Sequence, residues 1–256
     1  MKIYFQSASL GVPLLICVGF LQMAGAQIAD ITPPAVLSTE EVVNNLVRRN
    51  LERSKALSAF RGTRTYRLDY HGFPGARAAE MVVEVTYKAP GAKDFSVRSE
   101  TGSRLIIERV FKRMLQSEKE ANTEENQRGV ALNQENYRFT MVGQEENASG
   151  WAYVLSVEPK TQNKLLYRGR IWVDAKDFAV TRIEGEPAKN PSFWTKETQI
   201  EQVYTKVGDF WLPHSNRSST TVRLGGHALF TIDYGDYQIT AASQAGQTNG
   251  NLAGYR

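Results

Sequence analysis

The segment LLYRGRIWVDAKDFAVTRIEG, residues 165–185, constrains the fold more than any other part of this 256-residue chain. It has the pattern of two strands joined by a short turn at DAKD. An antiparallel sheet that packs on one side should alternate cleanly between apolar and polar residues. Here apolar residues occur on both faces, so the sequence predicts a sheet that has apolar surface to cover on each side. The alternation places Tyr167, Ile171, Val173, Phe178 and Val180 on one face, and Trp172 and Ile183 on the other.

The first 26 residues have the order of a secretory signal. Lys2 is followed by an apolar run at residues 10–23 and by the small residues Ala24-Gly25-Ala26. The run is short for a membrane-spanning helix, which needs about 20 residues, so a cleaved signal is favoured over an uncleaved anchor. Cys17 is the only cysteine and lies inside this run. The mature protein is therefore expected to be exported and to contain no disulfide and no cysteine metal ligand.

The charge pattern predicts a solvated surface rather than a nucleic-acid site. The formal net charge is +4, and acidic and basic residues are interspersed without a long basic run. No glycine-rich phosphate loop occurs, so no nucleotide cofactor is expected.

The histidines and carboxylates of the sequence lie outside recognisable catalytic and metal-binding motifs. His71, His214 and His227 lie beside predicted strands or turns and outside any catalytic motif. Asp174 and Asp177 fit a hairpin turn better than a metal site. The pair Glu184 and Glu186, which share a strand face, fits a solvated surface better than a catalytic carboxylate pair. We therefore predict a protein that is not an enzyme, with no metal and no cofactor.

Two amphipathic helices are predicted. Ser38 and Glu41 form a capping box at the start of a helix over residues 38–57, whose apolar residues recur at helical spacing. A second helix is predicted over residues 104–118, with Val110, Phe111 and Met114 among its apolar residues. Each helix needs a surface to cover.

The rest of the chain has the two-residue period of antiparallel strands, separated by turn residues such as EENASG, PKTQN and VGD. We predict one α+β domain over residues 27–240, followed by a disordered tail over 241–256. The predicted strands are 63–72, 79–88, 93–100, 137–143, 151–158, 164–174, 178–186, 194–206, 211–224 and 227–239.

The motifs in residues 153–185 resemble those of the LolA/LolB-like superfamily of outer-membrane lipoprotein-sorting proteins. The resemblance lies in Glu158-Pro159-Lys160 at a strand end, in Trp172-Val173-Asp174 before a tight turn, and in the returning strand from Phe178 to Ile183. The later Trp211-Leu212-Pro213 also resembles family sequences. The order of helix, three strands, helix and long meander extends the likeness over most of residues 38–239.

The resemblance implies a strongly curved antiparallel sheet, an unclosed β-barrel, with helices covering its concave face and a hydrophobic cavity beneath them. In classical carriers of this superfamily a strand arginine holds down the helical lid, and Arg64 lies in an early strand. The resemblance also implies a monomeric periplasmic carrier that binds a lipid or an acylated protein and moves it toward the outer membrane, with a partner protein in the inner or outer membrane. The residues expected to form the cavity and its lid are Leu46, Leu51, Tyr66, Leu68, Met81, Val83, Val85, Phe95, Phe111, Met114, Tyr153 and Trp172.

Three alternatives stay open at this point. One is a sensor or regulatory module of the same fold that binds a membrane-protein partner. Another is an enzyme acting on a lipid or glycan. The third is an ordinary α+β core, in which the aromatic residues fill the interior and leave no cavity.

Overall fold

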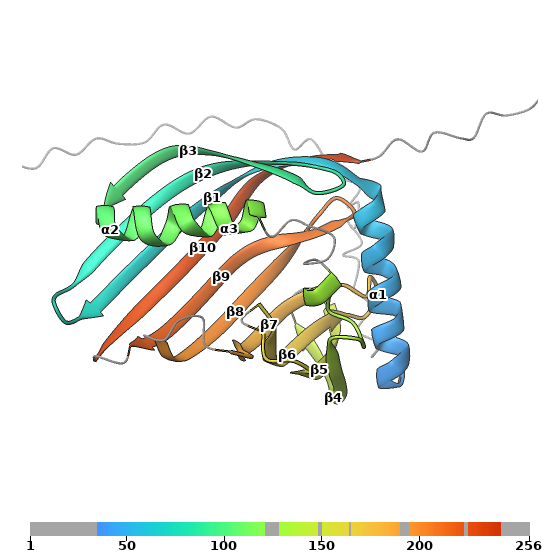
Figure 1. The fold of residues 1–256 in the computed structure, drawn as a ribbon. Coiled ribbons are helices and arrows are strands. Elements are labelled where there is room, and N and C mark those ends of the chain that lie inside the picture. The colour runs from blue at the N-terminus through green and yellow to red at the C-terminus, as the bar shows by residue number, and fades with distance from the viewer. Residues whose placement is uncertain are drawn as a thin grey trace, which may run out of the picture. The chain divides into compact units, whose positions relative to one another are not determined.

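A single antiparallel sheet of ten strands forms the frame of the protein (Figure 1). The computed structural model describes residues 35–120, 128–147, 150–163, 165–189, 195–222 and 225–241. The strand order is β3-β2-β1-β10-β9-β8-β7-β6-β5-β4, so β3 and β4 form the two edges and the sheet is not closed. The strands are β1 (Leu57–Gly72), β2 (Arg77–Lys88), β3 (Ala92–Gly102), β4 (Tyr137–Asn147), β5 (Gly150–Pro159), β6 (Tyr167–Asp174), β7 (Val180–Pro187), β8 (Thr195–Val207), β9 (Phe210–Val222) and β10 (Gly226–Ala241).

Helix α1 (Thr39–Ala56) begins as predicted. The Ser38 hydroxyl oxygen accepts a hydrogen bond from the Glu41 backbone N–H at 3.2 Å, and the Glu41 carboxylate accepts one from the Ser38 N–H at 2.8 Å. These reciprocal bonds satisfy backbone donors that the first helical turn cannot satisfy itself. Helix α1 therefore starts at a fixed residue.

The second helical segment runs without a break through α2 (Arg104–Ile106), η1 (Ile107–Phe111) and α3 (Lys112–Glu120). The middle part is a π turn, in which the Lys112 N–H donates to the Ile107 carbonyl. Such turns shift the helical register by one residue and often occur at functional positions. None of the helices in the described part of the chain is long and apolar enough to span a bilayer.

The predicted antiparallel sheet that does not close is confirmed, and each predicted strand overlaps an observed one. The described residues belong to one unit, Pro33–Arg256. The predicted signal at residues 1–26 lies outside the described residues. So does the predicted tail, except that Ala241 is the last residue of β10.

The face of the sheet predicted for one residue, Ile183, was wrong. Ile183 was expected on the face opposite Ile171, but the two residues are direct cross-strand partners and belong to the same buried cluster. The register shifts between Trp172 and Val173, where a β-bulge changes which residues of β7 face which side. Beyond a bulge, the residues that point to one face are those that the two-residue alternation assigns to the other face. The position of the bulge cannot be recognised from the alternation alone.

Two separate apolar clusters pack the helices against the sheet. In cluster 1, α1 contributes residues to a core built on β4–β7; in cluster 2, the α2–η1–α3 segment packs on β1, β2 and β10. Cluster 1 consists of Val42, Val43, Leu46, Tyr137, Tyr153, Leu155, Val157, Leu166, Ile171, Val173, Ile183 and Ala188. Cluster 2 consists of Tyr66, Ala79, Met81, Val83, Val85, Ile106, Ile107, Phe111, Leu115 and Ile232.

Gly169 and Gly185 are paired where β6 and β7 approach each other closely. A Cβ atom on Gly169 would lie 2.0 Å from the Glu184 carbonyl oxygen, and one on Gly185 would lie 2.0 Å from the Arg168 carbonyl oxygen. Gly169 also has a φ of 151°, which residues with a side chain rarely adopt. Glycine is therefore required at both positions for the strands to pair at this distance.

Candidate functional site

A single row of cross-strand partners connects the two clusters across nine strands. Partners that lie directly opposite one another in an antiparallel pair project from the same face of the sheet. Because both ends of the row belong to clusters that contain helix residues, α1 and the α2–η1–α3 segment pack on one face, which we call the helix-bearing face. The row runs Met141, Leu155, Ile171, Ile183, Gln202, Asn216, Ile232, Tyr66 and Met81.

The middle of this row is polar. Gln202 on β8 and Asn216 on β9 separate Ile183 of cluster 1 from Ile232 of cluster 2. In a neighbouring row, Ser218 lies between Ile200 and Phe230. The hydrophobic surface of the helix-bearing face is therefore not continuous, because a polar zone about two strands wide divides it.

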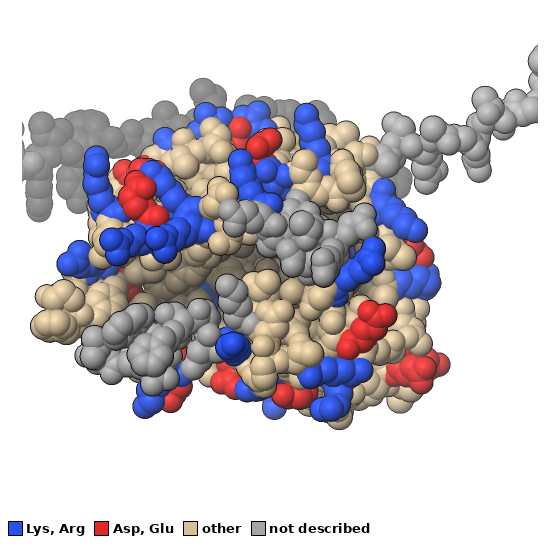
Figure 2. Space-filling model, viewed as in Figure 1, with Lys and Arg blue, Asp and Glu red and all other residues tan. Residues whose placement is uncertain are grey.

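Figure 2 shows a hollow in the surface below the Lys and Arg side chains of the α2–η1–α3 segment. A cavity of about 280 Å³ extends from the end of α1 to β8 and reaches both the apolar Ile183 and the polar Gln202. Burial raises the pKa of the Tyr204 phenol in this cavity to about 12, so the phenol stays neutral and can donate a hydrogen bond. The lining residues are Asn50, Arg53, Val130, Leu132, Tyr167, Val180, Ile183, Gln202, Tyr204 and Trp211.

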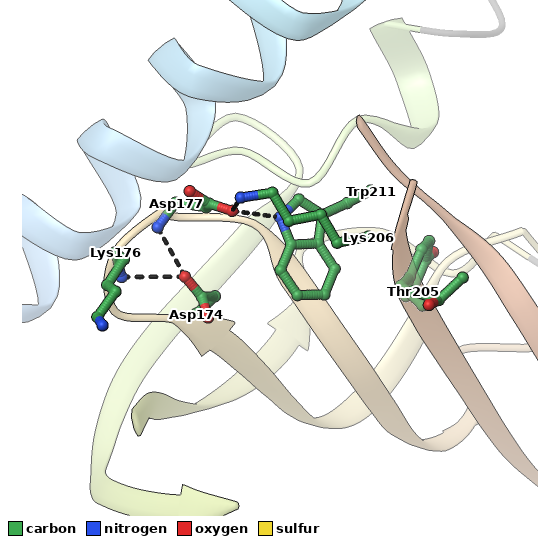
Figure 3. A pocket seen from close by; sticks show the side chains of 7 residues that line it. Asp174, Lys176, Asp177, Thr205, Lys206 and Trp211 are labelled. Carbon is green, nitrogen blue, oxygen red and sulfur yellow. Dashed lines mark hydrogen bonds and ion pairs between the residues drawn. The ribbon is translucent and has the colours of Figure 1, made fainter. Parts of the chain in front are cut away.

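A second cavity, of about 340 Å³, shares Tyr204 and Trp211 with the first and is closed on one side by the β6–β7 turn (Figure 3). In that turn Asp174 accepts hydrogen bonds from the backbone N–H groups of Lys176 and Asp177, at 3.0 and 2.6 Å. The Asp177 carboxylate in turn accepts from the Trp211 indole N–H at 2.8 Å. The predicted turn role of both aspartates is confirmed, since each of them organises the hairpin.

The C-terminal end of helix α1 is attached to the β6–β7 hairpin turn. The Arg53 guanidinium donates hydrogen bonds to the Asp177 and Phe178 carbonyl oxygens, at 2.8 and 3.0 Å. At the other end of the helix, the Thr39 hydroxyl oxygen accepts from the Met141 backbone N–H at 3.2 Å. Polar contacts at both ends thus supplement the apolar packing of α1.

The α2–η1–α3 segment is attached to the sheet by an ion-pair cluster. Arg64 of β1 donates two hydrogen bonds to the Glu118 carboxylate, at 2.7 and 3.2 Å, and Lys93 of β3 donates a third at 2.8 Å. The Arg64 guanidinium also lies 5.3 Å from the ring centre of Tyr234 and 5.6 Å from that of Phe95. Arg64 therefore connects an early strand to the second helical segment.

The charge of Glu118 makes this attachment depend on pH. Partial burial by itself would raise the pKa of the Glu118 carboxyl group, but the hydrogen bonds and charge of Arg64, helped by Lys93, lower it below the ordinary value of 4.5. A carboxyl group whose pKa is lower in the folded state stabilises the fold fully above its unfolded pKa. That stabilisation is lost as the pH falls through the lowered value.

We expect Glu118→Gln to lower the free energy of unfolding at pH 7 by about 1–3 kcal/mol, the range for hydrogen bonds to charged groups. The difference from the wild type should shrink as the pH falls from the ordinary pKa of the carboxyl group through the lowered pKa of the folded state, because the wild-type carboxylate is then protonated. Urea unfolding at several pH values measures this. Glu108→Gln is the control, since Glu108 is exposed on the same segment and should change stability by less than about 0.5 kcal/mol. Equal effects of the two substitutions at pH 7 would contradict the role of Glu118.

The structure disperses the twelve residues predicted to form the cavity and lid. Tyr66, Met81, Val83, Val85 and Phe111 lie in cluster 2, with Leu68 and Phe95 packed against it, while Leu46 and Tyr153 lie in cluster 1. Leu51 and Met114 are 54% and 37% exposed. Trp172 lies on the opposite face with Ala152 and Val154, where its indole N–H donates to Glu145 at 2.8 Å.

The residues around the observed cavities were mostly missed by the sequence reasoning. Gln202 and Asn216 could have been noticed, because β8 and β9 lack an apolar alternation, as in TKETQIEQ and HSNRSSTT. Interior strands of a sheet normally have at least one apolar face. Arg53 of α1 and Tyr204 of β8 line the cavity only because the fold brings α1 and β8 close to β6 and β7. The sequence does not indicate this arrangement.

The three histidines lie on β1, β9 and β10, and all of them are exposed. His71 and His227 are cross-strand partners at the exposed ends of β1 and β10, and His214 is exposed on β9. Among the described residues, no group of three or more histidine, aspartate and glutamate side chains could hold a metal ion.

Several solved structures resemble this chain. A DUF1329 family protein from Desulfovibrio piger has 13% identity and a TM-score of 0.39, with 81% of this chain and 94% of that chain covered. An outer membrane lipoprotein-sorting protein domain from Vibrio parahaemolyticus has 12% identity and a TM-score of 0.37, covering 83% and 96%. A LolA superfamily protein from Nitrosomonas europaea has 10% identity and a TM-score of 0.33, covering 80% and 94%.

The predicted resemblance to the LolA/LolB-like superfamily is thus confirmed as a similarity at low identity. At TM-scores this low, the likeness carries no conclusion about ligand or partner. No protein-family model matches the sequence, and a search of the curated proteins found no match.

Proposed function

We propose that the protein is a non-catalytic periplasmic carrier that binds a lipid or the acyl chains of a lipoprotein in the hollow of the helix-bearing face. The observation that supports this is the arrangement of the row: two apolar clusters, each packed against its own helical segment, lie on either side of a polar zone, and a cavity extends from cluster 1 to that zone. We propose further that this face is the concave face of the curved sheet, and that the two helical segments act as lids.

The size of the cavities is compatible with such a ligand. Small-molecule sites typically have volumes of about 300–1,000 Å³. The cavity beside α1, of about 280 Å³, has apolar lining residues, whereas the adjoining cavity of about 340 Å³ is lined largely by charged side chains and would suit the polar end of a ligand. Each buried methylene contributes about 0.8 kcal/mol, so even half of a long acyl chain would contribute several kcal/mol. The clusters themselves are filled by the protein's own side chains. A ligand would therefore occupy the hollow between them, or would have to displace a helix.

The separate attachments of the helices favour a carrier over a rigid core. Each segment also buries apolar residues against the sheet, α1 in cluster 1 and the α2–η1–α3 segment in cluster 2, so lifting either segment would expose apolar surface. An acyl chain that covers this surface would offset the cost, and because the clusters are separate, one segment can move without the other.

Purification of the protein from its own envelope, followed by lipid extraction and mass spectrometry, tests this proposal. We expect a lipid or an acylated protein near one equivalent, and we expect delipidated protein to bind a long-chain fatty acid in calorimetry. A co-purified protein without any lipid would favour the alternative of a regulatory module that binds a membrane-protein partner. Delipidated protein that binds no acyl compound would contradict the carrier function.

A further inference from the structure

The side chains of Gln202 and Asn216 interrupt an otherwise apolar row, where they are partly buried and Gln202 lines the cavity beside α1. Their strands, β8 and β9, are interior strands, and the opposite face of the same strands already carries the charged residues Glu201 and Arg217. In the part of the chain that the structure describes, no hydrogen bond reaches the side chains of Gln202 or Asn216. By contrast, Thr198 and Thr220 on the same two strands satisfy each other, at 3.1 Å.

We infer that Gln202 and Asn216 determine ligand specificity by pairing with an internal amide or ester group of an amphiphilic ligand. A side-chain amide offers both donors and an acceptor, so this pair can bind a carbonyl oxygen and an N–H at the same time. Neither residue is charged, and Arg53, which lines the same cavity as Gln202, already donates to the Asp177 and Phe178 carbonyl oxygens. The group that the two amides recognise is therefore neutral rather than a carboxylate or phosphate.

The position of the pair places the polar group within the ligand rather than at its end. Ile183 and Ile232 flank the pair on β7 and β10, which are three strand spacings apart, or roughly 14 Å. The cavity next to α1 continues past Gln202 to Ile183, Val180 and Leu132. A ligand that spans the hollow thus meets apolar surface on both sides of the two amides. A plain hydrocarbon chain in this position would leave both amides desolvated and unpaired, which disfavours its binding.

This inference rests on the proposed function, and one calorimetric experiment tests the two separately. The ligands are 8-(hexanoylamino)octanoate and pentadecanoate, which have backbones of equal length and the same terminal carboxylate, and differ in one amide in the middle of the chain. We expect delipidated wild-type protein to bind 8-(hexanoylamino)octanoate more tightly by roughly three- to tenfold, the effect of one or two net hydrogen bonds. The double variant Gln202→Met with Asn216→Leu should lose or reverse this preference, because its row is apolar throughout.

Gln199→Met is the matched control, since Gln199 is an exposed residue of the same strand on the opposite face, where it pairs with Ser219. It should keep the wild-type preference. If circular dichroism shows that the double variant is unfolded, the single Gln202→Met variant replaces it and should lose part of the preference. An unchanged ratio of the two affinities in a folded variant would overturn the inference and leave the carrier function standing. Failure of the wild type to bind either compound would overturn both.

Discussion

Phe111→Ala should lower the free energy of unfolding by about 3–5 kcal/mol, the range for large aromatic residues in a packed core. Phe111 ends the π turn of the second helical segment and has no exposed surface. Its ring centre lies 5.9 Å from that of Tyr66 and 6.1 Å from that of Phe230. Removal of the ring would leave a cavity where the segment meets β1 and β10, and the surrounding strands cannot close it.

Urea unfolding of both variants measures the effect, with Met114→Ala as the control. Met114 belongs to the same segment but is 37% exposed, so its loss should cost less than about 1 kcal/mol. If the two substitutions cost the same, cluster 2 does not hold the segment to the sheet. The burial of Phe111 also means that a charged substitution there would test folding rather than ligand binding.

The sequence was sufficient to predict the elements of this fold. The capping box of Ser38 and Glu41 is a local interaction, so the start of α1 follows from residues that are three apart. In β2, the alternation of Met81, Val83 and Val85 with exposed or half-buried residues predicts both the strand and its buried face. Where one face is buried and the register is regular, the pattern and the structure therefore agree.

The location of the candidate site could not be predicted from the alternation of apolar and polar residues. The bulge between Trp172 and Val173 brings Ile183 to the same face as Ile171, although the alternation predicts the reverse. The division into two apolar clusters follows from the neighbours of β8 and β9, because Gln202 and Asn216 matter only when they stand between Ile183 and Ile232. Cross-strand neighbours are set by the topology of the whole sheet. For this reason, a list of apolar residues could identify the core but not the hollow.

The hollow itself can be blocked without a change to either cluster. Ser218 lies on the helix-bearing face between Ile200 and Phe230, and its neighbour Ser219 lies on the opposite face. Ser218→Trp should fill the space between the clusters and weaken the binding of pentadecanoate by about tenfold or more, because the indole ring would occupy the volume that the ligand needs; a tenfold loss corresponds to about 1.4 kcal/mol. Tryptophan is well tolerated in strands, so the variant should fold.

Ser219→Trp makes the same chemical change one residue away and should leave the affinity within about twofold of the wild type, because surface substitutions usually act by less than about 0.5 kcal/mol. Calorimetry with delipidated protein gives both affinities, and circular dichroism checks the folding of both variants. Wild-type affinity in a folded Ser218→Trp variant would show that the ligand binds elsewhere. Wild-type affinity in this variant is expected if the ligand binds in cluster 1 or cluster 2 after a helical segment has lifted. In that case the Glu118→Gln variant, whose second helical segment is held less firmly, should bind pentadecanoate more tightly than the wild type.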